Sequence, residues 1–537
     1  MTIRFFSLIS IFTLLFVGLG FNLYHLQIQK GTEYVTRAEA RDEALTHLTL
    51  RRGQIFFTDR NNEKIPVALN RDEPVIYVVP KEIKDIEETA GQISDLLNID
   101  RATIREALKN KNTLFKLLID KASDEEVQKV QGTHIEGLYT DTKQYRFYPF
   151  EELGSQVLGF VGLNETHSVP TGLYGMEKMN DTTLAKGNDI ALTIDRNLQA
   201  QAEQLLQKLI KNNDATGGTI IIQEPYTGKI LTFANAPSFN PNSYKGASLQ
   251  SFLNPGIQYL YEPGSVFKPL TMSAGIDTGA ITPDTTFVDK GFVKLNGKTI
   301  KNANSKVYGK VTMTQVIENS INTGSVFAEQ QTGNGVFYDY LKRFGFGDKT
   351  GAGFPDEISG SLKNLERKDA RAVDFATASF GQGTGVTPIQ LVNAFSAIAN
   401  RGVLMKPFVD TEGKPTVVRR VIKEETAEKV IKMMEAAVKK ANVTTIPGYN
   451  IAGKTGTALI PDFKKGGYSD ELIHTFVGMV PSTNPRVVML LKLDRPKVGE
   501  LAGLTVVPGF KELAQFVINY YTIPPDVISE PADQKTQ

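Results

Sequence analysis

The most reactive side chains in the sequence are a serine and a lysine three positions apart, Ser265 and Lys268. They lie between Glu262 and Pro269, where a Pro-Gly turn precedes apolar residues, so we expect Ser265 to open a helix. Both side chains then share one helical face. A lysine amine that burial or a nearby cation keeps neutral can take the serine proton, and N–H groups at the helix start can stabilise an oxyanion. The pair alone also arises by chance, so other residues must support a nucleophilic site.

Two later segments carry groups that such a site needs. Ser320 and Asn322 lie at the predicted end of a helix over 312–319, where a hydroxyl and an amide can relay a proton and bind a peptide carbonyl. Lys454-Thr455-Gly456-Thr457 lies on a predicted strand and offers a cation, two hydroxyls, a backbone N–H and a glycine that lets another backbone approach closely. Taken singly, the first segment can be a helix cap and the second an edge-strand turn.

The segment from Gly448 to Thr455 also satisfies the nucleotide-binding pattern G-x-x-x-x-G-K-[ST]. That pattern binds phosphate only where a helix begins at its lysine. Pro461 and several glycines follow instead, so we treat the match as accidental. The sequence has 0 Cys, which excludes thiolate nucleophiles and Cys-ligated zinc, and its 5 His lie far apart, which argues against a zinc site or a His-based triad.

The composition is that of an ordinary globular chain. The 537 residues are 41% hydrophobic and 22% charged, enough for roughly two to four domains. The 60 Lys+Arg and 59 Asp+Glu leave a net charge of +1, which gives no electrostatic case for binding nucleic acid or an anionic membrane surface.

The elements that position the reactive residues are clearest in the second half. Asp195 caps a predicted helix with a leucine-rich stripe, and 510–521 is predicted as a closing helix. A mostly helical block over 265–445 separates two predicted strands from three others, over 218–223, 229–235, 449–457, 474–480 and 486–493. This order predicts one antiparallel sheet of five strands, with the helical block inserted and covering one face.

The N-terminal region begins with a single apolar segment, residues 5–24, preceded by Arg4 and followed by charges of both signs. Its length fits a membrane-spanning helix. A cleaved signal peptide is the alternative, but no Ala-x-Ala-like site follows. We therefore expect an uncleaved anchor, a polar stalk helix over 32–47, and the remaining chain on one side of the membrane. Further on, 52–61 is predicted as a strand and turn, and 86–108 as two helices that break near 98–100.

With the three motifs in this order, the chain resembles the penicillin-recognising serine acyltransferases, which carry S-x-x-K, S-x-N and K-T-G. More narrowly, it resembles the class B penicillin-binding proteins, which are monofunctional peptidoglycan D,D-transpeptidases. The pedestal motif of that family is matched at 52–61, with one extra residue before the Asp and with Asn62 in place of the usual Gly. Other similar stretches are 172–177, 381–383, 387–391 and 474–478.

The resemblance implies a role for each reactive residue. Ser265 would be the acylated nucleophile and Lys268 its general base. Ser320 would pass a proton to the leaving amine, and Asn322 would bind substrate and hold Lys268. Lys454 would bias the local electric field.

The same resemblance implies how substrate is held. Thr455 and Thr457, beside Gly456, would bind the terminal carboxylate of a stem peptide, and the N–H groups of Ser265 and Thr457 would form the oxyanion hole. D-Ala-D-Ala of a donor strand would acylate the serine, and the amine of a neighbouring stem peptide would resolve the acyl-enzyme. β-Lactams would mimic the donor.

The resemblance also implies an α+β multidomain fold. It consists of a single N-terminal transmembrane helix, an elongated mixed pedestal, and a penicillin-binding transpeptidase fold with a five-stranded antiparallel sheet flanked by helices plus an all-helical subdomain. We expect a cytoplasmic stub at 1–4, the anchor at 5–24, a pedestal or dimerisation domain at 25–185, the transpeptidase domain at 186–523 and a flexible tail at 524–537.

The expected partners follow from that identity. They are peptidoglycan stem peptides ending in D-Ala-D-Ala, β-lactams, a polytopic membrane glycosyltransferase and a second copy in a homodimer, with no cofactor and no metal. The protein would be a single-pass cell-membrane protein with a cytoplasmic N-terminus and an extracytoplasmic catalytic domain.

Other functions remain open at the level of sequence. A D,D-carboxypeptidase or a β-lactamase would use the same three motifs with water as acceptor, although the anchor and the long segment before the catalytic domain favour a transpeptidase. A non-catalytic cell-wall scaffold would not need intact Ser265, Lys268 and Lys454. A β-lactam sensor, an extra module or a glycosyltransferase domain would need more room than the chain offers around the anchor.

Overall fold

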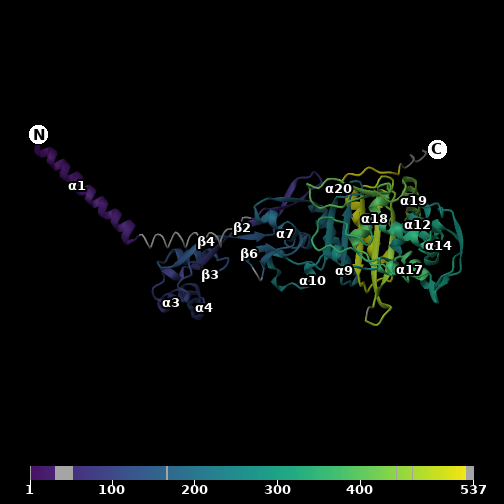
Figure 1. Cartoon of the computed structure of the whole chain (residues 1–537), viewed down its shortest axis with the longest axis horizontal. Coiled ribbons are helices and arrows are strands. Elements are labelled where there is room, and N and C mark those ends of the chain that lie inside the picture. Colours follow the sequence, from purple (N-terminus) through teal and green to yellow (C-terminus); the bar gives the residue numbers. More distant parts are fainter. Residues whose placement is uncertain (1, 31–51, 165–166, 443, 463, 528–537) are drawn as a thin grey trace, which may run out of the picture. The chain divides into compact units, whose positions relative to one another are not determined.

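The computed structural model describes residues 2–30, 52–164, 167–442, 444–462 and 464–527 (Figure 1). The predicted stalk helix over 32–47 and residues 528–537 of the predicted tail lie outside these ranges. Two compact units divide the chain: Met1–Arg52 with Asn70–Phe147, and Gly53–Leu69 with Tyr148–Gln537. The predicted domain boundaries remain a prediction beside this division.

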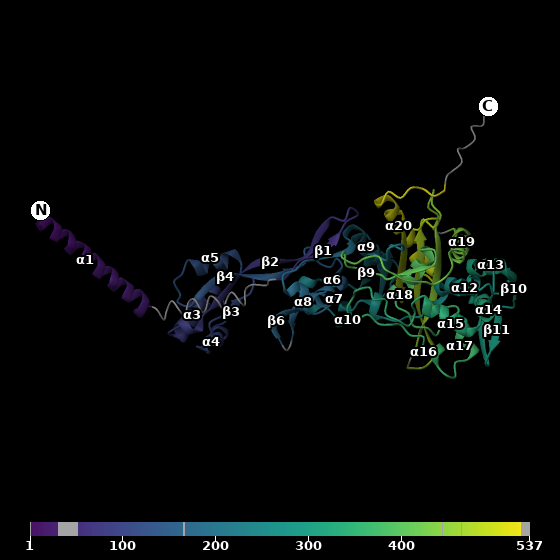
Figure 2. The same ribbon diagram turned by 45° about the horizontal axis from the view of Figure 1, so that its top comes forward.

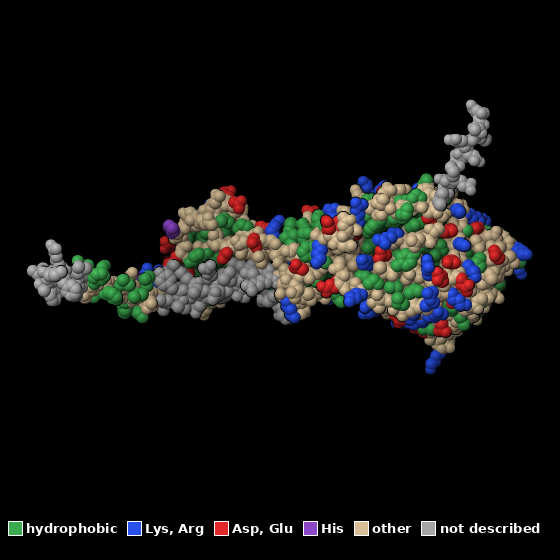
Figure 3. Space-filling model, turned by 90° about the horizontal axis from the view of Figure 1, so that it is seen from above, with side chains coloured by type: hydrophobic (Ala, Val, Ile, Leu, Met, Phe, Trp, Pro, Cys, Tyr) green, Lys and Arg blue, Asp and Glu red, His purple; other side chains and the backbone are tan. Residues whose placement is uncertain are grey.

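The chain begins with one long apolar helix, α1 (Thr2–Tyr24), which continues into a π-helical turn, His25–Gln29. Within it, Ser10–Ile28 is long and apolar enough to cross a membrane, and a signal sequence would meet the same test. Exposed hydrophobic side chains lie along the described part of this helix (Figure 3).

The first unit is a small α/β assembly. Strand β2 (Lys64–Val78) pairs in its second half with β3 (Lys116–Ile119) and also pairs with β4 (Leu138–Phe147). Its helices are α3 (Ile86–Leu97), α4 (Arg101–Leu108) and α5 (Asp124–Gln131). The predicted break between α3 and α4 is confirmed: Asn98 adopts a left-handed φ of 53° and the Asp100 carboxylate accepts from Thr103 N–H.

The second unit is built on the predicted five-stranded sheet, and all its pairs are antiparallel. The strand order is β16 (Ala452–Pro461), β17 (Tyr468–Val480), β18 (Val487–Asp494), β8 (Gly217–Gln223) and β9 (Ile230–Ala236). In chain order, β8 and β9 come first and β16, β17 and β18 come last; the two groups join where β18 pairs with β8. β17 begins earlier than predicted because its polar first residues pair with the end of β16, where Tyr468 faces Pro461.

Helices cover both faces of this sheet (Figures 1 and 2). α9 (Arg196–Asn213) and α20 (Ala502–Tyr520) pack on one face, and α18 (Pro388–Ala399) packs on the other. Asp195 caps α9 as predicted, since its carboxylate accepts from the N–H groups of Asn197 and Leu198. α20 starts earlier than predicted: Pro508 lies inside it, and its buried apolar face outweighs that breaker.

The inserted block is mostly helical, and it also holds short strand pairs that were not predicted. Its helices are α10 (Leu249–Phe252), α11 (Pro255–Gln258), α12 (Lys268–Asp277), α13 (Met313–Glu318), α14 (Asn322–Thr332), α15 (Asn334–Arg343), α16 (Lys363–Glu366), α17 (Ala372–Ala378) and α19 (Glu424–Ala441). Its strand pairs are β10 (Thr286–Asp289) with β13 (Gly309–Thr312), β11 (Phe292–Leu295) with β12 (Lys298–Lys301), and β14 (Val403–Met405) with β15 (Val417–Arg420).

Smaller elements complete the second unit. β1 (Ile55–Thr58) forms the strand predicted over 52–61 and pairs with the first half of β2 and with β7 (Ile190–Asp195). The remaining short elements before β7 are two strands, β5 (Val161–Asn164) and β6 (His167–Gly172), and three helices, α6 (Ser155–Leu158), α7 (Gly175–Met179) and α8 (Asp181–Ala185).

Candidate active site

The candidate nucleophile lies in a tight turn that leads into a buried helix. Ser265 belongs to a 3₁₀ turn, Gly264–Phe267, and α12 begins at Lys268. The predicted helix start is therefore a 3₁₀ turn that becomes an α-helix at the lysine, which keeps both residues about one turn apart. Ser265 is partly exposed, and its hydroxyl has no hydrogen-bond partner among the described residues. The oxygen is free to meet a substrate.

Two glycines let other segments approach this turn. A Cβ on Gly381, whose φ is +79°, would lie 2.3 Å from the Gly264 carbonyl oxygen, and Gly264 N–H donates to the Gly381 carbonyl at 3.1 Å. A Cβ on Gly456 of β16 would lie 2.7 Å from the Pro263 carbonyl oxygen. The turn is thus held between the 381–383 loop and the edge strand β16, as the glycine in the strand motif predicts.

Lys268 is fully buried and its amine is held by three acceptors. The Nζ lies 2.5 Å from the Ser320 carbonyl oxygen, 3.1 Å from Ser320 Oγ and 2.8 Å from Asn322 Oδ1. Burial, and secondly the charge of Lys454, lower the pKa of Lys268 well below its ordinary value. Both effects favour the neutral amine over the ammonium ion, and the neutral amine is the form that can accept a proton.

Lys454, on β16, contacts Ser320 as well. It is 3% exposed, and its Nζ donates to Ser320 Oγ and to the Thr455 carbonyl, both at 3.0 Å. Burial lowers the pKa of Lys454 to about 7. The two amines share one hydroxyl oxygen, so a charge on either disfavours a charge on the other.

Ser320 is the link between the two lysines. It sits just after α13 with a φ of +56°, a left-handed conformation that costs a non-glycine residue about 1 kcal/mol or more. In this conformation both its carbonyl and its hydroxyl face the lysine amines. Strain that persists where two buried amines converge is typical of a functional site.

Asn322, the first residue of α14, is positioned by groups that sequence reasoning missed. Its Nδ2 donates to the Lys301 carbonyl at 3.0 Å. The next residue, Thr323, donates through its hydroxyl to the buried Asp289 at 2.7 Å, and Asn302 donates to the same carboxylate at 2.9 Å. The only hint of this in the sequence is a weak turn signal, Asp289-Lys290-Gly291, so the role of Asp289 emerges from the fold.

The remaining motif residues lie on β16, beside the start of α20. Thr457 Oγ1 accepts from Ala502 N–H at 3.2 Å, and Thr455 Oγ1 lies 3.4 Å from Lys454 Nζ. Both threonines are partly exposed. Lys454 lies within a strand and no helix begins there, so the nucleotide-binding pattern lacks the helix N-terminus that phosphate binding needs.

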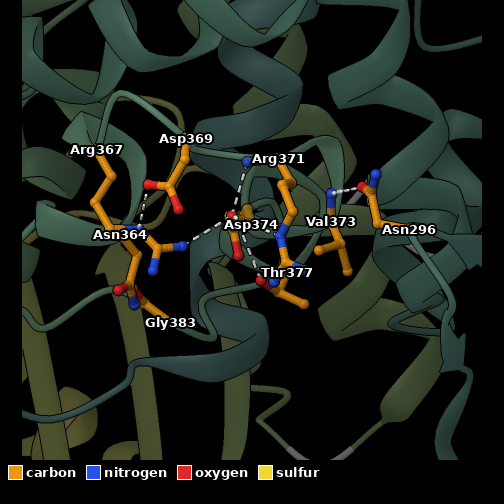
Figure 4. A network of polar contacts seen from close by, with 9 residues as sticks. All are labelled: Asn296, Asn364, Arg367, Asp369, Arg371, Val373, Asp374, Thr377 and Gly383. Carbon is orange, nitrogen blue, oxygen red and sulfur yellow. Dashed lines mark hydrogen bonds and ion pairs between the residues drawn. The ribbon is translucent and has the colours of Figure 1, made fainter.

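The loop over 381–383 is itself anchored by a polar network around α17 (Figure 4). Asp374 accepts from Arg371 N–H at 2.8 Å and from Arg367 at 3.2 Å, which fixes the start of the helix. Asn364 Nδ2 donates to the Gly383 carbonyl at 2.8 Å. Sequence reasoning found the loop and missed these supports, which come from a segment with no distinctive motif.

Comparison with known families gives two matches. Residues 218–515 match the model described as the penicillin binding protein transpeptidase domain, and residues 48–189 match the penicillin-binding protein dimerisation domain. The first match covers more than half of the chain and includes every candidate site residue.

Whole-chain relatives agree with these matches. The chain is 30% identical over 493 residues to the stage V sporulation protein D of Bacillus subtilis, covering 83% of this chain and 74% of that protein. It is 26% identical to the peptidoglycan D,D-transpeptidase FtsI of Escherichia coli, covering 94% and 89%.

A solved structure has a similar fold. The crystal structure of penicillin binding protein 3 from Mycobacterium tuberculosis complexed with aztreonam aligns with a TM-score of 0.69 at 25% identity, covering 89% of this chain and 97% of that chain. A dimerisation domain, a transpeptidase domain and relatives that span most of its length show that the chain belongs to the class B penicillin-binding proteins.

Proposed function

We propose that the chain is a peptidoglycan D,D-transpeptidase that works through an acyl-enzyme on Ser265. The observation that carries the proposal is the convergence of two buried lysine amines on Ser320 Oγ, beside a serine whose own hydroxyl is uncommitted. A buried amine with a lowered pKa is the kind of base that a serine nucleophile needs.

Acylation follows from this arrangement. Neutral Lys268 takes the proton of Ser265 Oγ as that oxygen attacks the carbonyl between the two D-Ala residues of a donor stem peptide. The carbonyl oxygen becomes an oxyanion, which accepts from the N–H groups of Ser265 and Thr457. The C–N bond then breaks as Ser320 Oγ–H gives its proton to the departing D-Ala nitrogen. Ser320 Oγ in turn takes the proton that Lys268 received from Ser265, which returns the lysine to its neutral form.

Deacylation uses the same groups in reverse. The amine of a neighbouring stem peptide attacks the acyl carbonyl, and its proton passes through Ser320 to Lys268. The C–O bond to Ser265 breaks, the serine oxygen recovers its proton, and the new peptide bond is the cross-link. A β-lactam acylates Ser265 in the same way, but its amine stays tethered and the serine remains blocked.

The edge strand β16 recognises the donor. The partly exposed Thr455 and Thr457 would offer their hydroxyls to the terminal carboxylate, and Lys454 would supply positive potential when protonated. Gly456 allows the strand to lie against the nucleophile turn, so the carboxylate and the attacked carbonyl are held together.

The test is covalent labelling with a fluorescent penicillin. Wild type should carry the label on Ser265, mapped by mass spectrometry of peptides, and Ser265→Ala should carry none while remaining folded. Ser273→Ala is a matched control, because that serine lies on α12 and its hydroxyl binds the Pro269 carbonyl at 2.8 Å. Label on another serine in the wild type would contradict the assignment.

The N-terminal helix supports a membrane location for this reaction. We propose a single-pass anchor with the N-terminus in the cytoplasm and the catalytic unit outside, since the apolar side chains described along α1 are exposed. Deleting residues 1–29 should release the protein from membranes and leave penicillin labelling intact. A truncated protein that still sediments fully with membranes would contradict the single-anchor proposal.

Two partners fit the proposed reaction. A polytopic membrane glycosyltransferase would supply the glycan strands, and the exposed helix α1 is a surface that it could contact. The match to a dimerisation domain over 48–189 supports association of two copies. Light scattering of the detergent-solubilised chain and copurification with and without residues 1–29 test the two associations separately.

A further inference from the structure

Beside the active site, the strand pair β11–β12 has one apolar and one basic face. Val293, Leu295 and Ile300 face inward and pack with α14 and α17. The pairing of Phe292 with Lys301 and of Lys294 with Thr299 places these four residues together on the other, exposed face. The hairpin is therefore amphipathic, with Lys294 and Lys301 on the face directed away from the core.

The neighbouring pair β10–β13 repeats this pattern. Phe287 and Val311 face inward, and Val288, which is 63% exposed, pairs with exposed Lys310. Between residues 286 and 312 the chain has a single acidic residue, Asp289, which is buried, and a set of exposed lysines: Lys290, Lys294, Lys298, Lys301, Lys306 and Lys310. Among the residues that the structure describes, no carboxylate is recorded in an ion pair with any of these lysines.

These outer faces are tied to the catalytic residues. The Lys301 carbonyl accepts from Asn322 Nδ2 at 3.0 Å, so the end of β12 touches the residue that holds Lys268. At the other end of the hairpin, Asn296 Oδ1 accepts from Val373 N–H at 3.1 Å (Figure 4). β10 and β11 lie with α14 and α17 in Figure 2. The basic surface is therefore fixed in place, and through Lys301 it adjoins Asn322 of the candidate active site.

We propose that the outer faces of β10–β13 and β11–β12 dock a peptidoglycan strand through the carboxylates of stem peptides other than the one being cross-linked. This inference rests on the proposed function, because each uncross-linked stem peptide ends in a carboxylate. Several such charges on one polymer match several unpaired lysines, and their attraction raises the local concentration of strands near Ser265.

The composition of the surface favours this occupant over a phosphate polymer. Phe292 is 46% exposed and Lys294 lies over its ring, while Lys306 lies over the ring of Tyr308 at 4.9 Å. Aromatic and aliphatic side chains between lysines suit a polymer that alternates apolar sugar faces and peptide methyl groups with carboxylates. A purely phosphate-based chain would gain only from the lysines.

The test compares binding of the polymer with acylation by a small β-lactam. Full-length protein in detergent is sedimented with insoluble peptidoglycan stripped of phosphate polymers. The variant Lys294→Glu/Lys306→Glu/Lys310→Glu should bind at least about tenfold more weakly at low salt, and the deficit should vanish near 1 M salt, where charges are screened beyond about 3 Å. Its second-order rate of acylation by penicillin should stay within about twofold of wild type, because penicillin is too small to span the surface.

Two variants serve as controls. Lys211→Glu/Lys429→Glu/Lys511→Glu makes the same charge change at exposed lysines on α9, α19 and α20, and it should bind like wild type. The corresponding triple Lys→Arg variant of the docking faces should also bind like wild type, because it keeps the charge.

Four results would overturn the proposal. They are equal binding by the test and control Lys→Glu variants, a parallel loss of penicillin acylation, undiminished binding to peptidoglycan whose carboxylates have been amidated, and binding that requires the phosphate polymers. Ser265→Ala should bind peptidoglycan like wild type. Failure of the docking proposal and failure of the proposed function can therefore be distinguished.

Discussion

Replacing Lys454 by methionine should stabilise the protein at neutral pH while impairing catalysis. The side chain is 3% exposed and burial lowers its pKa from 10.5 to about 7. Between these values the unfolded chain binds more protons at this residue than the folded chain does, so the free energy of unfolding rises with pH. Folding around the lysine therefore costs about 4 kcal/mol at pH 7 and about 2 kcal/mol at pH 9.

Methionine removes this cost and gives up amine hydrogen bonds to Ser320 and the Thr455 carbonyl, each worth about 1 kcal/mol. We expect Lys454→Met to be more stable than wild type by about 2 kcal/mol at pH 7. The advantage should shrink by about 2 kcal/mol at pH 9, and this change is independent of the lost hydrogen bonds.

The assay is urea unfolding at both pH values, followed by far-UV circular dichroism because the chain has 0 Trp. Lys429→Met, at an exposed lysine on α19, is the matched control and should show no pH-dependent difference from wild type. A stability difference between Lys454→Met and wild type that is the same at pH 7 and pH 9 would refute the reasoning.

Two further substitutions test the supports of the site. Gly381→Ala should reduce penicillin acylation at least about tenfold, because its Cβ would lie 2.3 Å from the Gly264 carbonyl oxygen. The control Gly383→Ala is also at positive φ, but the nearest atoms to its Cβ lie at 3.6 Å, so it should retain most of the rate. Equal acylation rates for the two variants would contradict the argument. Asp289→Asn should lower the free energy of unfolding by urea by about 1–3 kcal/mol and slow acylation. Each carboxylate oxygen of Asp289 accepts two hydrogen bonds, and the NH₂ group of an asparagine would face two of these donors. Unchanged stability and acylation rate would show that the network does not position Asn322.

The sequence was informative about the site because its motifs are local. A Pro-Gly turn before apolar residues, a helix that ends at Asn319, and a glycine-containing strand each predict where one reactive group lies. The structure brings Lys268, Ser320, Asn322 and Lys454 into contact, while their catalytic roles remain predictions. The five-stranded sheet was predictable because its strands are long apolar runs separated by one helical block.

The supports were not predictable because they depend on contacts between distant segments. Nothing local in Gly381 indicates that it meets the backbone of Gly264, or in Asp289 that its partners include Thr323. The short strands β10 to β13 contain many lysines and few apolar residues, so their sequence predicts a loop. The inner face of β11–β12 becomes evident only from its packing against α14 and α17. Pro508 similarly led to a predicted start of α20 that is too late. The helix begins at Ala502 because its apolar side chains are buried against the sheet.

The most direct test of the central claim is the second-order rate of acylation by penicillin across pH for wild type, Lys268→Arg and Lys268→Ala. If neutral Lys268 is the base, the wild-type rate rises with pH through the lowered pKa of that amine, whose first cause is burial. Arginine keeps the charge and does not deprotonate in this range, so Lys268→Arg should lose acylation nearly as fully as Lys268→Ala. An active Lys268→Arg enzyme with a flat pH profile would contradict the general-base assignment.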